Sequence, residues 1–155
     1  MVSQLKQSDK EFLQDAQAVC TAAVQGSKIA LDRSRNTQVR HFAQRVLDDH
    51  TQARNKLDAL AEAKGVEVSD SPSLTQRAKL VILSLREGSN FDRSYVESVG
   101  VNVHQEVIDL FQKAAASSAD ADVRALANDT LPALQRDLDT AKTLQVTTRQ
   151  EESER

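Results

Sequence analysis

The sequence of 155 residues has few of the residues that build sheets, tight turns and disulfide frameworks. It contains four glycines, two prolines, four phenylalanines, one tyrosine and no tryptophan, which argues against a turn-rich β protein. The single cysteine, Cys20, excludes an internal disulfide and leaves the redox compartment open. The rest of the sequence is rich in Ala, Leu, Val, Gln, Asp and Arg, and we therefore predict an all-α fold.

Charge and hydropathy exclude several classes of partner. The net charge of -3 comes from interleaved acidic and basic residues without a Lys/Arg run, so we expect no nucleic-acid binding and no electrostatic attraction to anionic lipid. The longest aliphatic run, Leu80 to Leu83, is too short to cross a bilayer, which predicts no transmembrane segment. No signal peptide follows Met1, so the chain as given is expected in the cytoplasm, although a processed mature form would look the same.

Two blocks of the sequence recur at nearly one offset. The first pair, offset by 83, is Asp9-x-x-Phe12 and Asp92-x-x-Tyr95, and the second pair, offset by 84, is Asn36-x-x-Val39-Arg40 and Asp120-x-x-Val123-Arg124. Each half predicts a helical hairpin, in which Asp9 or Asp92 caps the first helix and Asn36 or Asp120 caps the second. Two such hairpins predict a ferritin-like four-helix bundle.

The segment between the hairpins has a different composition. From Gly65 to Asn90 it is richer in Ser, Pro, Asp and Gly, with one short helix expected from Ser73 to Leu85. It has enough residues to cross a bundle about 38 Å high, although a short connection with simple up-down order also fits. We therefore expect an N-terminal arm at 1–7, the bundle at 8–145 with a short extra helix in the connector, and a frayed tail at 146–155.

Two histidines and an aspartate fall at one level of the expected interior. His50 lies 14 residues past Asn36, whereas His104 lies 16 residues before Asp120 and Asp137 lies 17 residues after it. At 1.5 Å per residue each is roughly 21 to 26 Å from its hairpin turn, near half the height of the bundle. All three also lie within or at the edge of the apolar stripe of their helix.

This polar layer predicts either a metal site or a structural contact. Two imidazoles and one carboxylate suit a single Zn or Fe(II) ion, with Glu97, two turns from His104, as a fourth candidate ligand. The Glu-x-x-His pattern of di-iron bundles is absent, because the residues three positions before the histidines are Leu47, Val101 and Gln38. In the alternative, neutral His50 and His104 hydrogen-bond to each other or to Asp137 and fix the helix register. An empty or ligand-filled cavity is the third possibility. Asp49 points about 100° away from His50 and is expected to face solvent.

Several short motifs resemble a known bacterial family. They are Asp49-His50-Thr51, Phe91-Asp92-x-x-Tyr95, His104-x-x-Val107 and Thr130-Leu131-Pro132, within about residues 8 to 145. They resemble ferritin-like domains of unknown function, many of which are exported to the periplasm or outer membrane. The resemblance implies a ferritin-like fold and, by ancestry, a metal site. In that family a glutamate usually stands at the position of Ala23, and a histidine at the position of Asp137.

Two classes of function remain. The first is a non-enzymatic module of the envelope or of stress biology with a vestigial polar site, and the second is a metal-binding or redox protein that holds one Zn or Fe ion through His50, His104 and Asp137. Hydrolysis and acyl transfer are not expected, since no nucleophile with a positioned base and no Gly-rich loop is present. The outward faces show no second apolar stripe, so we expect a monomer or a weak dimer and leave any protein partner open.

Overall fold

The computed structural model is helical throughout the part of the chain that it describes, residues 5–69 and 71–153, and no strand occurs there. The helices are α1 (Gln7–Arg33), α2 (Thr37–Ala63), α3 (Leu74–Ser84), α4 (Gly88–Tyr95), α5 (His104–Ser117) and α6 (Ala121–Ser153), and a π-helical segment, η1 (Val96–Val103), joins α4 to α5. Because α4, η1 and α5 follow one another without a break, they form one continuous rod. The predicted all-α class is confirmed.

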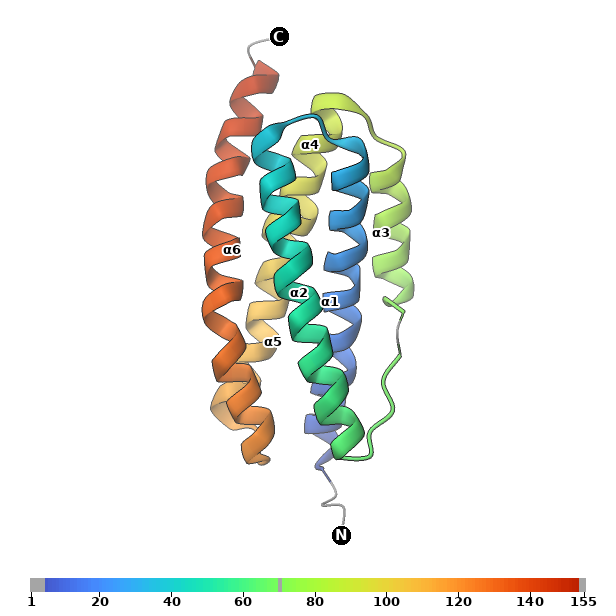
Figure 1. Cartoon of the computed structure of the whole chain (residues 1–155), viewed down its shortest axis with the longest axis vertical. Coiled ribbons are helices and arrows are strands. Elements are labelled where there is room, and N and C mark those ends of the chain that lie inside the picture. The colour runs from blue at the N-terminus through green and yellow to red at the C-terminus, as the bar shows by residue number, and fades with distance from the viewer. Residues whose placement is uncertain (1–4, 70, 154–155) are drawn as a thin grey trace.

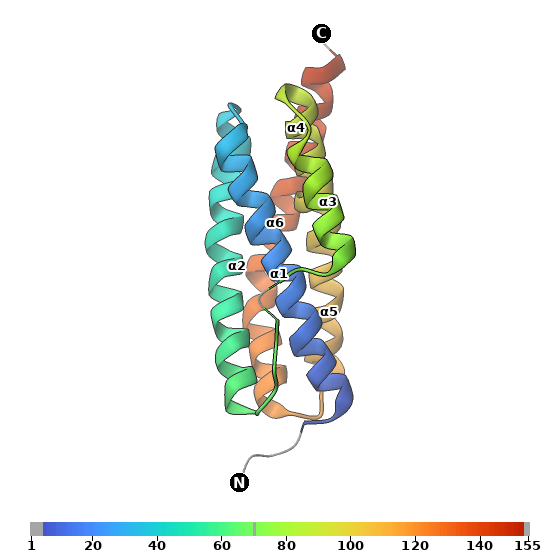
Figure 2. The same ribbon diagram turned by 90° about the vertical axis from the view of Figure 1, so that its right-hand side faces the viewer.

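The long helices lie side by side along one axis (Figures 1 and 2). In Figure 1, α1 rises and α2 descends, the connector and α3 climb the outside, and the α4–η1–α5 rod descends before α6 returns upward. The helix α1 packs against α2 and α5, and α6 packs against α2 and the rod, so that α2 and α5 lie on a diagonal. The connector therefore crosses the height of the bundle, and α2 runs parallel to the α4–η1–α5 rod.

Local capping residues set most of the helix ends as the sequence predicted. The Asn36 side chain accepts from two backbone N–H groups of α2, and Asp120 does the same for α6. Ser73 and Gln76 form a capping box at the start of α3, within the predicted range. Gly65, with φ of +69°, ends α2 in the left-handed conformation that glycine adopts without steric cost.

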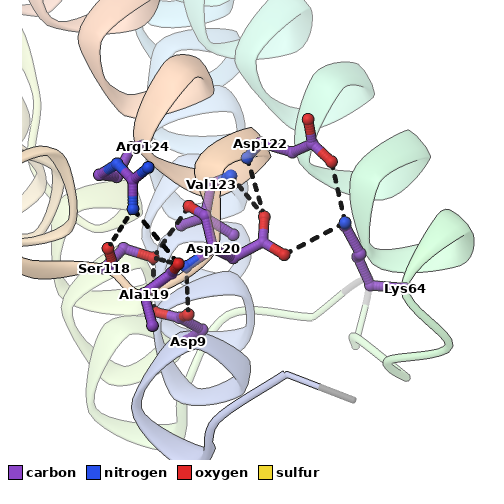
Figure 3. Close-up of polar contacts among 8 residues, drawn as sticks. All are labelled: Asp9, Lys64, Ser118, Ala119, Asp120, Asp122, Val123 and Arg124. Atoms are coloured by element: carbon purple, nitrogen blue, oxygen red, sulfur yellow. Dashed lines mark hydrogen bonds and ion pairs between the residues drawn. The ribbon is translucent and has the colours of Figure 1, made fainter. Parts of the chain in front are cut away.

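The duplicated aspartates do not cap their own helices, and that prediction was wrong. The helix α1 begins at Gln7 and α4 at Gly88, and both aspartates lie inside their helices with buried side chains. Asp92 accepts a hydrogen bond of 2.6 Å from the Ser34 hydroxyl, in the turn of the opposite hairpin. Asp9 accepts a bond of 2.7 Å from Ser118, in the turn of the other hairpin (Figure 3). Each hairpin thus supplies an acceptor to the turn of its neighbour.

The repeated arginines hold the same two turns, rather than forming the surface ion pairs that arginines near a cap usually form. Arg40 donates to the carbonyls of Ser34 and Leu31. Arg124 donates to the carbonyl of Ser118 at 2.8 Å (Figure 3). We call Asp92, Ser34 and Arg40 the upper clasp, and Asp9, Ser118 and Arg124 the lower clasp.

The lower clasp is extended by further polar contacts in the same turn. The Asp120 N–H donates to Asp9 at 3.3 Å. The Lys64 ammonium, at the end of α2, lies 3.1 Å from Asp120 and 2.8 Å from Asp122 (Figure 3). The C-terminal end of α2, where the connector begins, is thereby joined to the turn between α5 and α6.

The π-helical segment accounts for the difference of one residue between the repeat offsets of 83 and 84. From Asp9 to Ser34 there are 25 steps along the chain, whereas from Asp92 to Ser118 there are 26. Both segments run from one clasp to the other, so the α4–η1–α5 rod must take up one additional residue over the same height. A helix accommodates one inserted residue as a π-helical turn, and η1 lies between the two clasps of the longer rod.

Two glycines allow η1 to approach its neighbours closely. A Cβ atom on Gly100 would lie 3.0 Å from the Ala141 Cβ of α6, and one on Gly26 would lie 2.8 Å from a methyl group of Val99. The helix α3 covers the outer side of α1, which is buried at every position from 19 to 24.

The two ends of the bundle differ from expectation. The helix α6 continues to Ser153 and Thr148 is buried, so the expected frayed tail at 146–155 is helical as far as the structure describes it. Residues 154–155 lie outside the described residues. Of the expected N-terminal arm, residues 1–4 also lie outside them, Leu5 is buried, and α1 has begun at Gln7.

We expect the Asp9→Ala substitution to lower the free energy of unfolding by about 2 kcal/mol, because a buried hydroxyl and a turn N–H both lose their acceptor. Urea denaturation measures this loss. The control is Asp15→Ala, an exposed position of the same helix, which should change stability by less than about 0.5 kcal/mol. A double-mutant cycle with Ser118→Ala should give a coupling energy of about 1 kcal/mol, and additive losses would contradict the clasp.

Candidate metal centre

His50 of α2, His104 of α5 and Asp137 of α6 meet in the interior, each with 0 % of its surface exposed. The Nε2 atoms of the histidines are 3.0 Å apart, and His104 Nε2 is 3.9 Å from Asp137 Oδ2. With one ligand atom taken from each residue, all three atoms lie within 4.8 Å of one another. The structure thus brings together the three residues that the sequence placed at one height of the bundle.

The π-helical segment orients His104. Its Nδ1 lies 2.9 Å from the carbonyl oxygen of Val99, five residues earlier. Because a carbonyl only accepts, Nδ1 must carry the ring proton, and Nε2 of the neutral ring presents a lone pair to the centre. A histidine whose other nitrogen donates to a carbonyl in this way is oriented as metal-binding histidines usually are. The His50 Nε2–H then donates to His104 Nε2.

Both imidazoles are neutral near pH 7. Burial lowers the pKa of His50 well below its usual value, and the neighbouring His104 ring lowers it further. Burial also lowers the pKa of His104, and the bonds to the Val99 and Gly100 backbone offset part of this shift. Neutral rings are the form in which histidine binds a metal ion.

Asp137 has an unusual environment for a buried acid. Among the described residues, neither carboxylate oxygen has a hydrogen-bond partner, and His50 Nδ1 also has none. Burial, and after it the Asp49 carboxyl, which favours a proton shared between the two acids, raises the pKa of Asp137 to about 8. An ionised carboxylate without donors is costly in the interior, so this group must keep a proton or acquire a positive partner.

Asp49 is the residue near this centre that sequence reasoning missed. We expected it to face solvent, but it is only half-exposed, its Oδ2 is buried without a hydrogen-bond partner, and its carboxyl acts on Asp137. It also lines a groove of about 1100 Å³ between α2 and α6, together with Arg45 and Thr140. Because α2 packs against both α1 and α6, two side chains 100° apart can both face neighbouring helices. Asp49 therefore lies between the groove and the buried centre.

Glu97, the expected fourth ligand, does not join the centre. Its side chain is exposed and lines a separate groove of about 430 Å³ between α3 and η1. Seven residues of an α-helix make almost two turns, which would place Glu97 and His104 on one face. The extra residue of η1 rotates one relative to the other by about 100°, so the prediction fails for a geometric reason.

Two neighbouring polar side chains have structural roles. The hydroxyl groups of Tyr95 and Ser27 are 2.7 Å apart and buried, so each satisfies the other. Burial raises the pKa of Cys20 to about 12, which keeps its thiol protonated. Cys20 is accordingly a packing residue, and it is not among the three clustered ligand residues.

Long helices that enclose two neutral imidazoles and a carboxylate define a helical domain with a candidate metal centre. The chain belongs to DUF4142, a family described as a domain of unknown function, whose sequence profile matches residues 1–144. No curated protein matches the chain. No helix among residues 5–69 and 71–153 is long and apolar enough to cross a membrane.

Two solved structures share this fold. A DUF305 fragment from Deinococcus radiodurans matches with a TM-score of 0.82 at 14% identity, covering 94% of this chain and 99% of that one. A DUF305 protein from Streptomyces coelicolor matches with a TM-score of 0.77 at 17% identity, covering 91% and 92%. At such low identity the likeness extends to the helical fold alone.

We expect the Asp137→Asn substitution to remove a pH-dependent loss of stability. Folded Asp137 keeps its proton to about pH 8, whereas an aspartate in the unfolded chain loses it near about pH 4. The folded state therefore binds more protons between these values, and its stability falls as the pH rises from about 4 through about 8. In urea titrations with a chelator, the wild type should lose more stability than the variant between about pH 6.5 and about pH 9. Equal losses would show that Asp137 ionises normally.

Proposed function

We propose that this DUF4142 protein is a ferritin-like bundle that binds one divalent Zn or Fe ion through His50, His104 and Asp137. The observation that carries the proposal is the Asp137 carboxyl group, which is fully buried beside two neutral imidazoles and the Asp49 carboxyl, with no donor group for either oxygen among the described residues. The single long crossover supports the ferritin-like assignment, since that fold has one such connection.

The two imidazoles are already spaced for a small ion, whereas the Asp137 side chain would have to move toward them. Zn–N bonds of about 2.0–2.1 Å in tetrahedral geometry separate two nitrogens by about 3.3 Å, near the 3.0 Å between the imidazoles. The Asp137 oxygen is 3.9 Å from His104 Nε2, and the widest separation within the trio is 4.8 Å. It would therefore approach His104 by about half an ångström and close the widest separation by about 1.5 Å. A fourth position is left for a water molecule or for Asp49, which is next to Asp137. Such a set of ligands would bind and hold an ion, without a nucleophile or base positioned for catalysis.

A second candidate is a non-enzymatic bundle in which the same residues form a structural polar layer. The separation of 3.0 Å between the imidazoles favours it, because a hydrogen bond between neutral rings satisfies one nitrogen on each. A role in the envelope or in stress biology would suit such a module. The neighbour from Streptomyces coelicolor is described as a candidate secreted protein, which supports an envelope location for either candidate.

Metal titration of protein purified without an affinity tag tests the proposal. We expect one equivalent of Zn²⁺ or Co²⁺ to bind, and the substitutions His50→Gln and His104→Gln to weaken binding at least about 100-fold, because each removes one of three ligands. The control is the substitution His41→Gln. His41 is an exposed histidine on α2, the helix that also carries His50, and this variant should bind metal as the wild type does. Circular dichroism verifies that each variant is folded.

Stability measured with and without metal separates the two candidates. If the ion binds, an excess of about 100 times the Kd should raise the free energy of unfolding by about 2.7 kcal/mol, and the histidine variants should not respond. If the polar layer is purely structural, Zn²⁺ should leave stability unchanged, while a double-mutant cycle of His50 and His104 in chelator should still show coupling. The latter result would overturn the metal proposal.

A further inference from the structure

The candidate metal centre has no direct opening to solvent. His50, His104 and Asp137 are fully buried, so an ion from outside must pass another side chain to reach them. A divalent ion that has lost its water cannot cross an apolar interior, because nothing there replaces its hydration. A route to the centre must therefore offer oxygen or nitrogen ligands along its length.

The groove between α2 and α6 leads to such a ligand. Asp49 lines this groove together with Arg45, Asp48 and Thr140. Arg45 and Asp48 are exposed and carry opposite charges, so the rim alone selects no ligand. Asp49 differs from them, because its Oδ2 is buried and has no hydrogen-bond partner among the described residues. Asp49 thus reaches from the groove toward the interior.

Asp49 connects the groove to the centre. Burial and, after it, the Asp49 carboxyl raise the pKa of Asp137, so the two carboxyl groups are neighbours. Both Asp137 oxygens lack a hydrogen-bond partner among the described residues, and Asp137 Oδ2 lies 3.9 Å from His104 Nε2. Buried oxygen atoms without donors therefore continue from the wall of the groove to the imidazoles.

The groove between α3 and η1 has no such connection. The buried side chains that line it, Ala22, Leu83 and Val99, are apolar. Its acidic residues, Glu97 and Glu106, are exposed. In the part of the chain that the structure describes, none of its lining residues has a buried polar atom without a hydrogen-bond partner. This groove therefore offers an ion no ligand between solvent and the centre.

The helix α3, which forms one wall of that second groove, corrects an expectation from the sequence. Leu74, Val81 and Leu85 are exposed along one of its faces, so the expectation that no second apolar stripe exists was wrong. None of these three residues lines the groove, so the stripe adds nothing to a route toward the centre.

We propose that Asp49 is the entry residue of the metal centre: a divalent ion that comes through the groove between α2 and α6 binds the Asp49 carboxylate first and then passes to Asp137 and the two histidines. This inference rests on the proposed function, because it assigns a route to that same site. At each step a carboxylate oxygen or an imidazole nitrogen replaces a water molecule of the ion. The ion is therefore never without ligands on its way into the bundle.

Stopped-flow mixing of the metal-free full chain with Co²⁺ tests the route, because Co²⁺ bound by imidazole and carboxylate ligands absorbs visible light. We expect Asp49→Asn to slow association at least about tenfold, since a carboxylate beside the path attracts the incoming cation. The control is Asp139→Asn, which removes the same charge from an exposed position of α6 outside the groove and should associate as the wild type does. Circular dichroism verifies that both variants are folded.

A bulky side chain in the groove separates the route from the binding of the ion. Thr140→Phe should slow association and release of Co²⁺ by the same factor, about tenfold, and leave the Kd unchanged, because an obstacle on a route acts in both directions. Release is measured by mixing the Co²⁺-loaded chain with excess chelator. The matched control is Ser94→Phe, at a half-buried position of the groove between α3 and η1, which should change neither rate.

The outcomes distinguish a failure of the route from a failure of the site. Unchanged association rates in the Asp49→Asn and Thr140→Phe variants, with Co²⁺ bound at equilibrium, would overturn the route and leave the proposed function standing. Slower association in Ser94→Phe would assign entry to the other groove and would also overturn it. Faster release with unchanged association in Asp49→Asn would make Asp49 a ligand and not the entry residue. Absence of Co²⁺ binding to the wild type would overturn the proposed function and the route together.

Discussion

The reciprocal clasps are the contacts on which the rest of the arrangement depends. Each is a buried aspartate that accepts from a serine in the turn of the opposite hairpin, at 2.6 Å in the upper clasp and 2.7 Å in the lower one. Helices that pack through apolar stripes alone can shift by a turn, about 5.4 Å, with little loss of buried area. The clasps prevent this at both ends of the bundle. They thereby hold His50, from one hairpin, level with His104 and Asp137, from the other.

The two halves share a scaffold but not a site. With an offset of 84, the counterparts of His104, Asp137 and His50 are Cys20, Ala53 and Leu134. All three counterparts are buried, and they lie in the apolar core. The duplicated architecture therefore carries one polar trio and one apolar trio, so a single ion is the largest metal content that it suits. The extra residue in the longer rod adds to this asymmetry, because η1 ends next to His104 and supplies the carbonyl that orients its ring.

Much of this could be predicted from the sequence, because helix geometry is regular. The repeated blocks predicted the two helical hairpins, local capping chemistry predicted Asn36 and Asp120 as caps, and the constant rise per residue placed the trio at one level. Asp9 was misassigned because an acid near a helix start suits a cap and a tertiary contact equally well. Glu97 and Asp49 were misplaced because a helical wheel assumes 3.6 residues per turn and one buried direction. The difference between the repeat offsets of 83 and 84 indicated one inserted residue in the second half, and it could have predicted η1 from the sequence.

The clasps already fix the register of the helices, and this limits what the central trio of His50, His104 and Asp137 can contribute. A polar layer that served only to fix register would repeat what the clasps already do at both ends of the bundle. Burial raises the pKa of Asp137 to about 8, so this layer also destabilises the fold at neutral and higher pH. A bound cation would reverse that effect, because its charge stabilises the ionised carboxylate and the neutral imidazoles supply lone pairs. The cost at Asp137 is therefore easier to understand for a site that takes an ion than for one that stays empty.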